Sequence, residues 1–269
     1  MEDRIRVDVT DGVADVRLVR ADKMNALDDA MFTALIETGE ALKADSRVRA
    51  IVLSGEGRAF CAGLDMGNFA KMASGERKGG SGLVEHPRTP GGSNRAQHAV
   101  MVWREQPAPV IAAVHGVALG GGFQLMLGAD IRIVAPDAKL AILEIKWGLV
   151  PDMGGMVLLR GLVRDDVARD LTYTGRMFTG AEALGYGLAT RVAADPRAEA
   201  LALAAEIAGK NPHAVRGAKR LFAAMADGDQ HAILKLETEE QVALIGSPNQ
   251  VEAVMAGLQK RTPTFADVA

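Results

Sequence analysis

Two short glycine-rich stretches are the most informative parts of this chain: RAFCAGLD at residues 58–65 and HGVALGGGFQ at residues 115–124. Each follows an apolar run that predicts a buried strand, and each has small residues where the backbone must be exposed. Small side chains let a ligand approach the main chain closely. A helix beginning near Gly121 would also direct free N–H groups and its positive dipole end at that ligand.

Together the two stretches suggest an oxyanion hole, in which two backbone N–H groups converge on one carbonyl oxygen as negative charge develops on it. A glycine-rich turn taken alone could equally serve only to permit a tight bend. A phosphate-binding loop is less favoured, because neither stretch has the G-x-G-x-x-G spacing and the chain has no G-x-x-x-x-G-K followed by Ser or Thr.

The pattern on either side of these stretches predicts a mixed α/β fold. Alternating apolar residues at 5–9 and 14–18, with Asp11 and Gly12 between them, predict a β-hairpin. A nearly continuous apolar run at 48–53 predicts a strand covered on both sides, and residues 109–114 and 131–134 predict two further strands. Asp28 can cap a helix that runs to about Ala44.

The rest of the chain divides into a loop and a helical region. Residues 74–97 are rich in Gly, Ser, Pro and Arg, so we expect a mobile loop that could act as a lid. The pattern from residue 164 onward is mostly helical, over 164–173, 197–209, 213–225, 230–245 and 248–258. We expect both tryptophans, Trp103 and Trp147, to lie in the core.

Composition argues against several classes of partner. The 269 residues are 48% hydrophobic and 24% charged, with a net charge of −3, which gives no electrostatic case for nucleic acid. Cys61 is the only cysteine, so an internal disulfide is excluded. The sequence has neither a signal-peptide pattern nor an apolar run long enough to span a membrane, and its histidines lack metal-ligand spacing. We therefore expect a cytoplasmic enzyme without a metal or a membrane partner.

Several segments of the chain resemble those of a known family. The two glycine-rich stretches, in this order and separation, resemble those of the crotonase (enoyl-CoA hydratase/isomerase) superfamily. Three more segments resemble the same family: DKMNAL at 22–27, EIKWGLVPDMGG at 144–155 and QKR at 259–261. The resemblance covers essentially the whole chain and implies a spiral of ββα turns, with a core over residues 1–195. Residues 196–269 would form a helical C-terminal region that assembles a homotrimer or a dimer of trimers.

The resemblance also implies a ligand and its contacts. The substrate would be an acyl-CoA thioester, so coenzyme A is part of the substrate and no separate cofactor is expected. The backbone from Ala59 through Cys61 to Ala62 would line the CoA channel. Lys23 and Lys260 become candidates for the CoA phosphates, although a solvated surface position is an equally good interpretation of each. The backbone N–H groups that form the oxyanion hole would be those of Leu64 and Gly121.

The catalytic residues are where the sequence departs from the family. Hydratases of this family use two glutamates, and the first position is occupied here by Gln124, while Glu144 occupies the second. A glutamine side chain can neither accept nor release a proton in catalysis under physiological conditions. The presence of Glu144 alone therefore favours a double-bond isomerase, which needs a single carboxylate to carry the proton. Asp152 lies where dienoyl-CoA isomerases have an aspartate, and it could act as an acid partner or merely cap a helix near Met153. Two alternatives stay open: a hydratase with Gln124 in a supporting role, and a non-catalytic acyl-CoA-binding protein.

Overall fold

The computed structural model of the chain describes residues 4–68, 88–227 and 229–268. Its strands are β1 (Ile5–Thr10), β2 (Val13–Leu18), β3 (Ala50–Gly55), β4 (Val110–Val114), β5 (Val117–Leu119), β6 (Ile131–Val134), β7 (Lys139–Ala141), β8 (Phe178–Thr179) and β9 (Arg191–Val192). Its α-helices are α1 (Asp29–Ala44), α4 (Arg95–Arg104), α5 (Gly121–Leu127), α6 (Gly155–Leu159), α7 (Asp165–Thr174), α8 (Gly180–Tyr186), α9 (Pro196–Ala208), α10 (Pro212–Asp227), α11 (Gln230–Leu244) and α12 (Pro248–Gln259). Two short 3-10 helices, η1 (Ala21–Lys23) and η2 (Glu144–Trp147), lie in connections.

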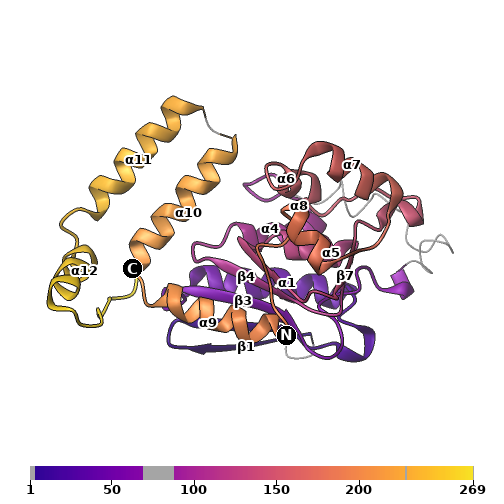
Figure 1. Ribbon diagram of the computed structural model, residues 1–269, viewed down its shortest axis with the longest axis horizontal. Coiled ribbons are helices and arrows are strands. Elements are labelled where there is room, and N and C mark those ends of the chain that lie inside the picture. The colour runs from indigo at the N-terminus through magenta and orange to yellow at the C-terminus, as the bar shows by residue number, and fades with distance from the viewer. Residues whose placement is uncertain (1–3, 69–87, 228, 269) are drawn as a thin grey trace.

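A six-stranded sheet in the order β1-β2-β3-β4-β6-β9 forms the centre of the fold. The predicted hairpin is confirmed, because β1 pairs antiparallel with β2, and every later pairing in this sheet is parallel. The prediction that the strand near residue 50 is covered on both faces is also confirmed. Ala50 and Val52 pack against α9, whereas Ile51 and Leu53 belong to the cluster that includes α1 and α4. Figure 1 shows α9 along one side of these strands.

Successive turns of the chain each place one strand in the large sheet and the next in a smaller one. After β4 the chain forms β5 and then α5, and after β6 it forms β7 and then η2. β4 pairs parallel with β6, and β5 pairs parallel with β7, so the two turns stack in register. An isolated bridge between Cys61 and Ala118 adds the segment after β3 to the same stack. The repeated unit is the expected ββα turn.

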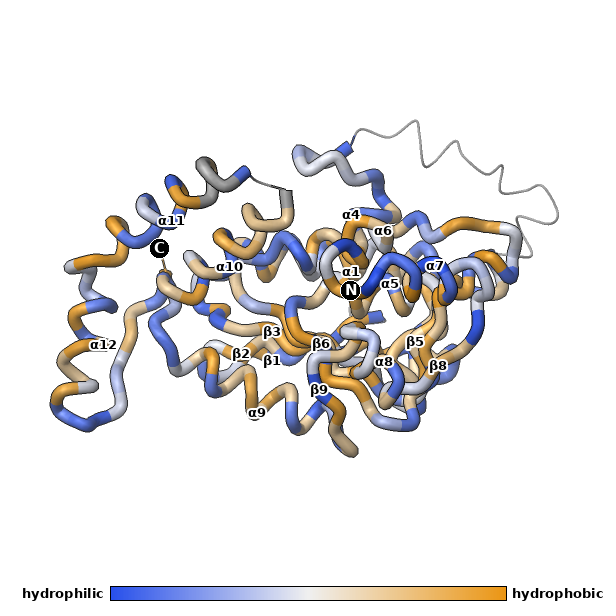
Figure 2. The backbone as a smooth tube through the Cα atoms, turned by 45° about the horizontal axis from the view of Figure 1, so that its top comes forward, coloured by the Kyte–Doolittle hydropathy of each residue, from blue (hydrophilic) through white to orange (hydrophobic). Residues whose placement is uncertain are grey.

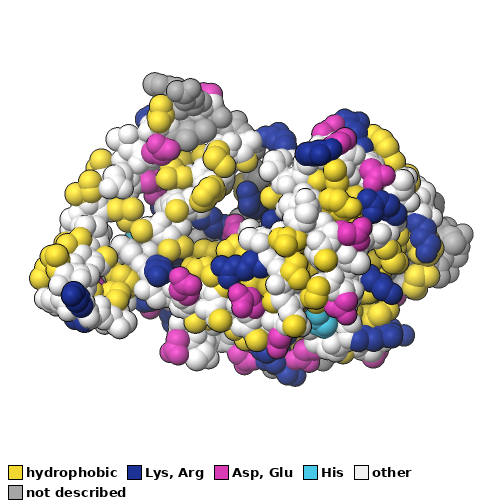
Figure 3. Space-filling model, viewed as in Figure 1, with side chains coloured by type: hydrophobic (Ala, Val, Ile, Leu, Met, Phe, Trp, Pro, Cys, Tyr) yellow, Lys and Arg dark blue, Asp and Glu magenta, His cyan; other side chains and the backbone are white. Residues whose placement is uncertain are grey.

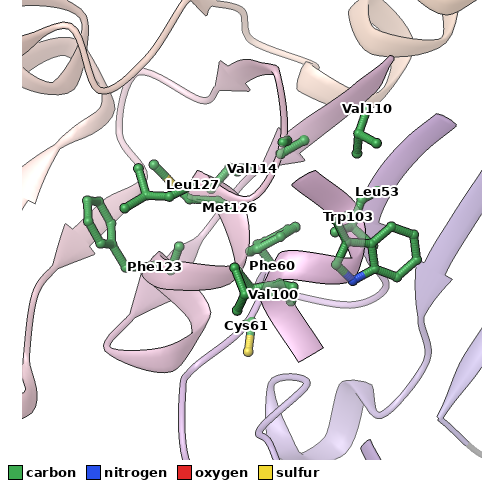
Figure 4. Packing of buried hydrophobic residues seen from close by; sticks show 14 of the residues in the cluster. Leu53, Phe60, Cys61, Val100, Trp103, Val110, Val114, Phe123, Met126 and Leu127 are labelled. Carbon is green, nitrogen blue, oxygen red and sulfur yellow. The ribbon is translucent and has the colours of Figure 1, made fainter. Parts of the chain in front are cut away.

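The main core lies between the sheet and the helices α1, α4 and α5. Trp103, Phe60 and Phe123 are its largest side chains with no exposed surface (Figure 4). The prediction for Trp103 is therefore confirmed, but the prediction for Trp147 is wrong. Trp147 is 41% exposed, and the ammonium group of Lys146 lies 5.4 Å from the centre of its ring. The 3-10 helix η2 is only four residues long, and it turns Glu144 inward while Ile145 and Trp147 face outward.

Helices α10, α11 and α12 extend away from the sheets, and we call residues 212–259 the C-terminal arm (Figures 1 and 2). Helix α9 does not belong to the arm, because Ala200 and Ala204 are fully buried against the sheet. The expected boundary at residue 195 thus falls between β9 and α9, two elements of the packed body. Most of the loop expected at residues 74–97 lies outside the described residues, and its end forms the start of α4 at Arg95.

Candidate active site

The stacked ββα turns bring three distant segments of sequence to one place. Leu64 follows β3 and the Cys61 bridge, Gly121 follows β4 and β5, and Glu144 follows β6 and β7. Each residue therefore occupies the corresponding position on its own turn. The sequence positions are far apart, but parallel pairing of the strands that precede them places them side by side.

The two N–H groups expected to form an oxyanion hole come from adjacent segments. A methyl group built on Gly63 would lie 3.6 Å from the amide nitrogen of Gly121, and only 2.5 Å from the carbonyl oxygen of Leu119. That crowding, together with a φ of +87°, explains why residue 63 is glycine. The parallel bridge between Leu27 and Leu64 uses the amides of Leu27 and Asp65. Within the described chain, the N–H groups of Leu64 and Gly121 therefore donate to no protein acceptor.

Glu144 is a buried carboxylate close to this pair of N–H groups. The residue is 8% exposed, and a methyl group built on Gly120 would lie 3.3 Å from its Oε1. Its Oε2 is buried and has no hydrogen-bond partner among the described residues. Burial raises the pKa of Glu144, and the negative charge of Asp152 raises it further, while the nearby backbone N–H of Glu144 and the hydrogen bond from Gln124 lower it. A carboxyl with a raised pKa is suited to exchange protons near neutral pH.

Gln124 lies beside Glu144 on helix α5 and is 1% exposed. Its Nε2 donates a hydrogen bond of 2.7 Å to Oε1 of Glu144. Its Oε1 accepts hydrogen bonds from the backbone N–H groups of Met153 and Gly155, at 2.8 and 2.9 Å. The side-chain amide therefore connects the glutamate to the loop that carries Asp152.

Asp152 precedes that pair of backbone donors. The residue as a whole is exposed. Its carboxyl group is nevertheless partly desolvated by surrounding protein atoms, and this desolvation raises the pKa of Asp152. Helix α6 begins at Gly155, with Gly154 as its N-cap and no side-chain cap, so the interpretation of Asp152 as the cap of this helix is wrong. A second carboxyl group that also exerts a field on Glu144 is left free to act at the site.

The residues expected to contact coenzyme A fall into two groups. Ala59 and Cys61 are fully buried, backbone included, and the N–H and carbonyl groups of Cys61 are bound to Val117 and Leu119. Neither residue therefore presents a free surface to a ligand in this structure, and burial raises the pKa of the Cys61 thiol to about 12. Ala62 is half-buried, and its N–H donates to the carbonyl of Met24, which places Lys23 close to this segment. Lys260 is exposed at the end of α12, and no described contact connects it with the other site residues.

Asn25 is a contributor that the sequence analysis did not single out. It is fully buried, and its Nδ2 donates to the carbonyl oxygens of Glu56 and Ala59, at 3.0 and 2.8 Å. It thereby fixes the turn that leads into the first glycine-rich stretch. The signal was present, because Asn25 lies within the segment at 22–27 that resembles the family.

Comparison with known proteins identifies the family. The model of the enoyl-CoA hydratase/isomerase family matches residues 8–268. A probable enoyl-CoA hydratase of Bacillus subtilis is 33% identical over 245 residues, covering 90% of each chain. The mitochondrial Delta(3,5)-Delta(2,4)-dienoyl-CoA isomerase of Mus musculus is 31% identical over 254 residues, covering 93% of this chain and 77% of that protein.

Solved structures agree with this assignment. A crystal structure of a putative enoyl-CoA hydratase from Streptomyces coelicolor superimposes with a TM-score of 0.88 at 33% identity, covering 98% of this chain and 94% of the other. That of an enoyl-CoA hydratase from Bacillus anthracis gives a TM-score of 0.87 at 30% identity, covering 97% and 98%. The chain belongs to the enoyl-CoA hydratase/isomerase family, the crotonase superfamily, and has its α/β fold of ββα turns. No helix in the described part of the chain could cross a membrane.

Proposed function

We propose that this enzyme shifts a double bond along an enoyl-CoA thioester, with Glu144 as the base. One observation carries the proposal: Oε1 of Glu144 is held by Gln124, which cannot carry a proton, while the buried Oε2 has no partner among the described residues. A single carboxylate with one unengaged oxygen can remove a proton from one carbon of the substrate and return it to another.

The reaction would use the backbone N–H groups of Leu64 and Gly121 to hold the thioester oxygen. Glu144 would take a proton from the α-carbon of a 3-enoyl thioester, and the electrons of that C–H bond would pass into the carbonyl group. The resulting dienolate carries its charge on the oxygen that the two N–H groups face, and such donors stabilise it strongly in a site without water. Glu144 would then return the proton to the γ-carbon, which gives the conjugated 2-enoyl thioester.

Asp152 supports a second candidate, in which the proton moves further along the chain. Its carboxyl group has a raised pKa and its charge acts on Glu144. Together the two groups could take a proton from the α-carbon of a 3,5-dienoyl thioester and deliver one to the ε-carbon. The Mus musculus relative is named for this conversion.

The expected assembly is part of the proposal. Exposed apolar side chains lie along the arm, among them Phe222, Met225, Val242 and Leu258, at 63%, 62%, 68% and 75% exposure (Figure 3). Apolar surface of this extent on a soluble protein marks an interaction site. We expect it to be covered by further copies of the chain in a trimer or a dimer of trimers, in the cytoplasm.

The test of function compares three substrates: a 3-enoyl-CoA, a 3,5-dienoyl-CoA and crotonyl-CoA. The parent enzyme should conjugate the 3-enoyl thioester and hydrate crotonyl-CoA slowly. Glu144→Gln should lower turnover by at least about 10²-fold, the lower range for a general acid–base group, while thioester binding is retained. Asp152→Asn should lower turnover of the dienoyl substrate selectively.

Three outcomes would contradict the proposal. Rapid hydration of crotonyl-CoA by the parent that is abolished in Glu144→Gln would identify a hydratase instead. Full activity in Glu144→Gln would remove the glutamate from the mechanism. Tight binding of thioesters without turnover of any of them would identify an acyl-CoA-binding protein.

A further inference from the structure

The amide of Gln124 has its orientation fixed by its neighbours. Its Oε1 faces two backbone N–H groups, which only an acceptor can satisfy, and its Nε2 faces a carboxylate oxygen, which requires a donor while that carboxyl is ionised. Turning the amide over would place like groups against each other at all three contacts. The side chain is 1% exposed, so in this arrangement it offers almost no surface to a water molecule.

The same amide joins two separate segments of the site. Oε1 of Gln124 lies so close to Gly155 that a methyl group built there would be 2.8 Å away. The loop from residue 148 to 155 is therefore held against α5 by Gln124, and η2 is held there through Glu144. A change at residue 124 acts on the base and on the Asp152 loop together.

We propose that Gln124 is a positioning residue: its amide holds Oε1 of Glu144 and the backbone of the Asp152 loop, so that only Oε2 of Glu144 is presented to the substrate. This rests on the proposed function for the role of Glu144 as base. Gln124 is then neither a proton carrier nor a site for the attacking water of a hydratase. With glutamine in place of the family's first glutamate, the site would favour transfer of a proton between two carbons of the substrate over addition of water.

The proposal has a consequence for the ionisation of Glu144. Burial and Asp152 raise the pKa of Glu144, whereas the nearby backbone N–H groups of Glu144 and Leu143 and the hydrogen bond from Gln124 lower it. Removing the donor at residue 124 should therefore raise the pKa of Glu144 further. A hydrogen bond to a charged group is typically worth about one pKa unit or more.

The decisive variant is Gln124→Met, which keeps the approximate volume and removes both halves of the contact. Gln124→Glu is the partner variant, because it keeps an oxygen for Met153 and Gly155 but places a second carboxyl against Glu144. Gln106→Met is the matched control. Gln106 is also a buried glutamine, 2% exposed, and its Nε2 binds two backbone carbonyls, of Gly39 and Val102, away from Glu144.

Two readouts are measured for each variant against pH. The first is the ionisation of Glu144 itself, obtained as the infrared carboxyl difference between each protein and its Glu144→Gln counterpart. The second is kcat/KM for the 3-enoyl thioester, whose acidic limb reports the base in the free enzyme. Because the first readout needs no activity, it tests Gln124 even if the proposed reaction is wrong.

We expect Gln124→Met to move both the infrared transition and the acidic limb upward by about one pH unit. Gln124→Glu should move them at least as far, because two adjacent carboxyls share a proton. Gln106→Met should leave both unchanged, even if its melting temperature falls.

Unmoved transitions in both Gln124 variants would overturn the proposal and leave Gln124 a packing residue. An equal shift in Gln106→Met would overturn it too. If the infrared transition moves but the parent fails to isomerise the 3-enoyl thioester, the positioning role stands and the proposed reaction does not.

Discussion

At the scale of single residues, the site depends on a carboxylate kept where its charge is disfavoured. Glu144 is buried, and its Oε2 has no partner among the described residues. Such a group lowers the stability of the fold while remaining reactive, which is a common compromise at catalytic sites.

This arrangement predicts how stability depends on pH. The folded-state pKa of Glu144 is raised above its unfolded value, so between these two values the native state binds more protons and the free energy of unfolding falls as pH rises. Above the folded-state pKa the full cost is present, at about 1.4 kcal/mol for each unit of the shift. Glu144→Gln should therefore melt higher than the parent at pH 7, and the difference should vanish below the ordinary pKa of a glutamate.

Thermal unfolding of both proteins across pH measures this effect. Glu37→Gln, at an exposed position of α1, is the control and should change stability little at any pH. A Glu144→Gln variant that is less stable than the parent at pH 7 would show that the carboxylate contributes favourable contacts that outweigh its burial.

At the scale of elements, the start of α5 combines a tight packing contact at Gly122 with an N–H group at Gly121 that donates to no acceptor in the described chain. Gly122 meets the first stretch so closely that a methyl group on it would lie 2.2 Å from the carbonyl oxygen of Cys61. A methyl group on Gly121 would instead meet the ends of two flexible side chains, Leu27 and Met153, each at 2.9 Å. A methyl group on either glycine would thus meet a different obstacle: fixed backbone at Gly122, and movable side-chain ends at Gly121.

These two glycines give a paired prediction. Valine keeps its own N–H, but its side chain, crowded against Leu27 and Met153, should displace that N–H from the thioester oxygen. Gly121→Val should therefore lower kcat by roughly 10²–10³-fold, the typical effect of losing one oxyanion-hole donor, while the melting temperature falls moderately. Gly122→Ala should lower the melting temperature much more, because a backbone carbonyl cannot move aside as a side chain can. Steady-state kinetics and thermal unfolding of both variants measure the contrast. If the Gly121 variant loses stability and turnover equally, its glycine is a packing device and the oxyanion assignment weakens.

At the scale of the whole molecule, the C-terminal arm is fixed at its base and apolar along its length. Lys219 of α10 forms an ion pair of 2.7 Å with Asp130, and Arg216 donates to the carbonyl of Val48 at 3.1 Å. Asn249 of α12 exchanges two hydrogen bonds with the backbone of Ala266, both at 2.9 Å. These contacts hold the arm in a defined orientation while leaving its apolar side chains exposed.

We predict that the arm drives assembly. Three apolar positions of α11 are only partly covered within one chain: Ala232 is exposed, and Leu236 and Leu244 are half-buried. A chain that ends at Asp227 should be monomeric and poorly soluble. Leu258→Lys, which keeps the full length, should shift the protein toward smaller species in light scattering after gel filtration. A truncated chain that still assembles like the parent, or a Leu258→Lys variant of unchanged size, would contradict this.

The sequence alone determined the family, most element positions and the identity of the chemical groups at the site. Strand alternation, continuous apolar runs and helix caps depend on neighbouring residues, so the predicted hairpin, the strands near residues 50, 110 and 131 and the C-terminal helices all agree with the structure. The sequence also determined that residue 124 cannot carry a proton, because this is a property of the glutamine side chain itself.

Only the tertiary structure decided what those groups contact. The amide of Gln124 binds the backbone of Gly155, 31 positions away, and Oε1 of Glu144, 20 positions away. Helix α9 packs on the sheet although it is helical like the arm, and Trp147 is exposed although it is apolar. None of these features follows from the local pattern of residues. The contacts of Gln124 arise because strand pairing stacks the ββα turns and brings together residues that are far apart along the chain.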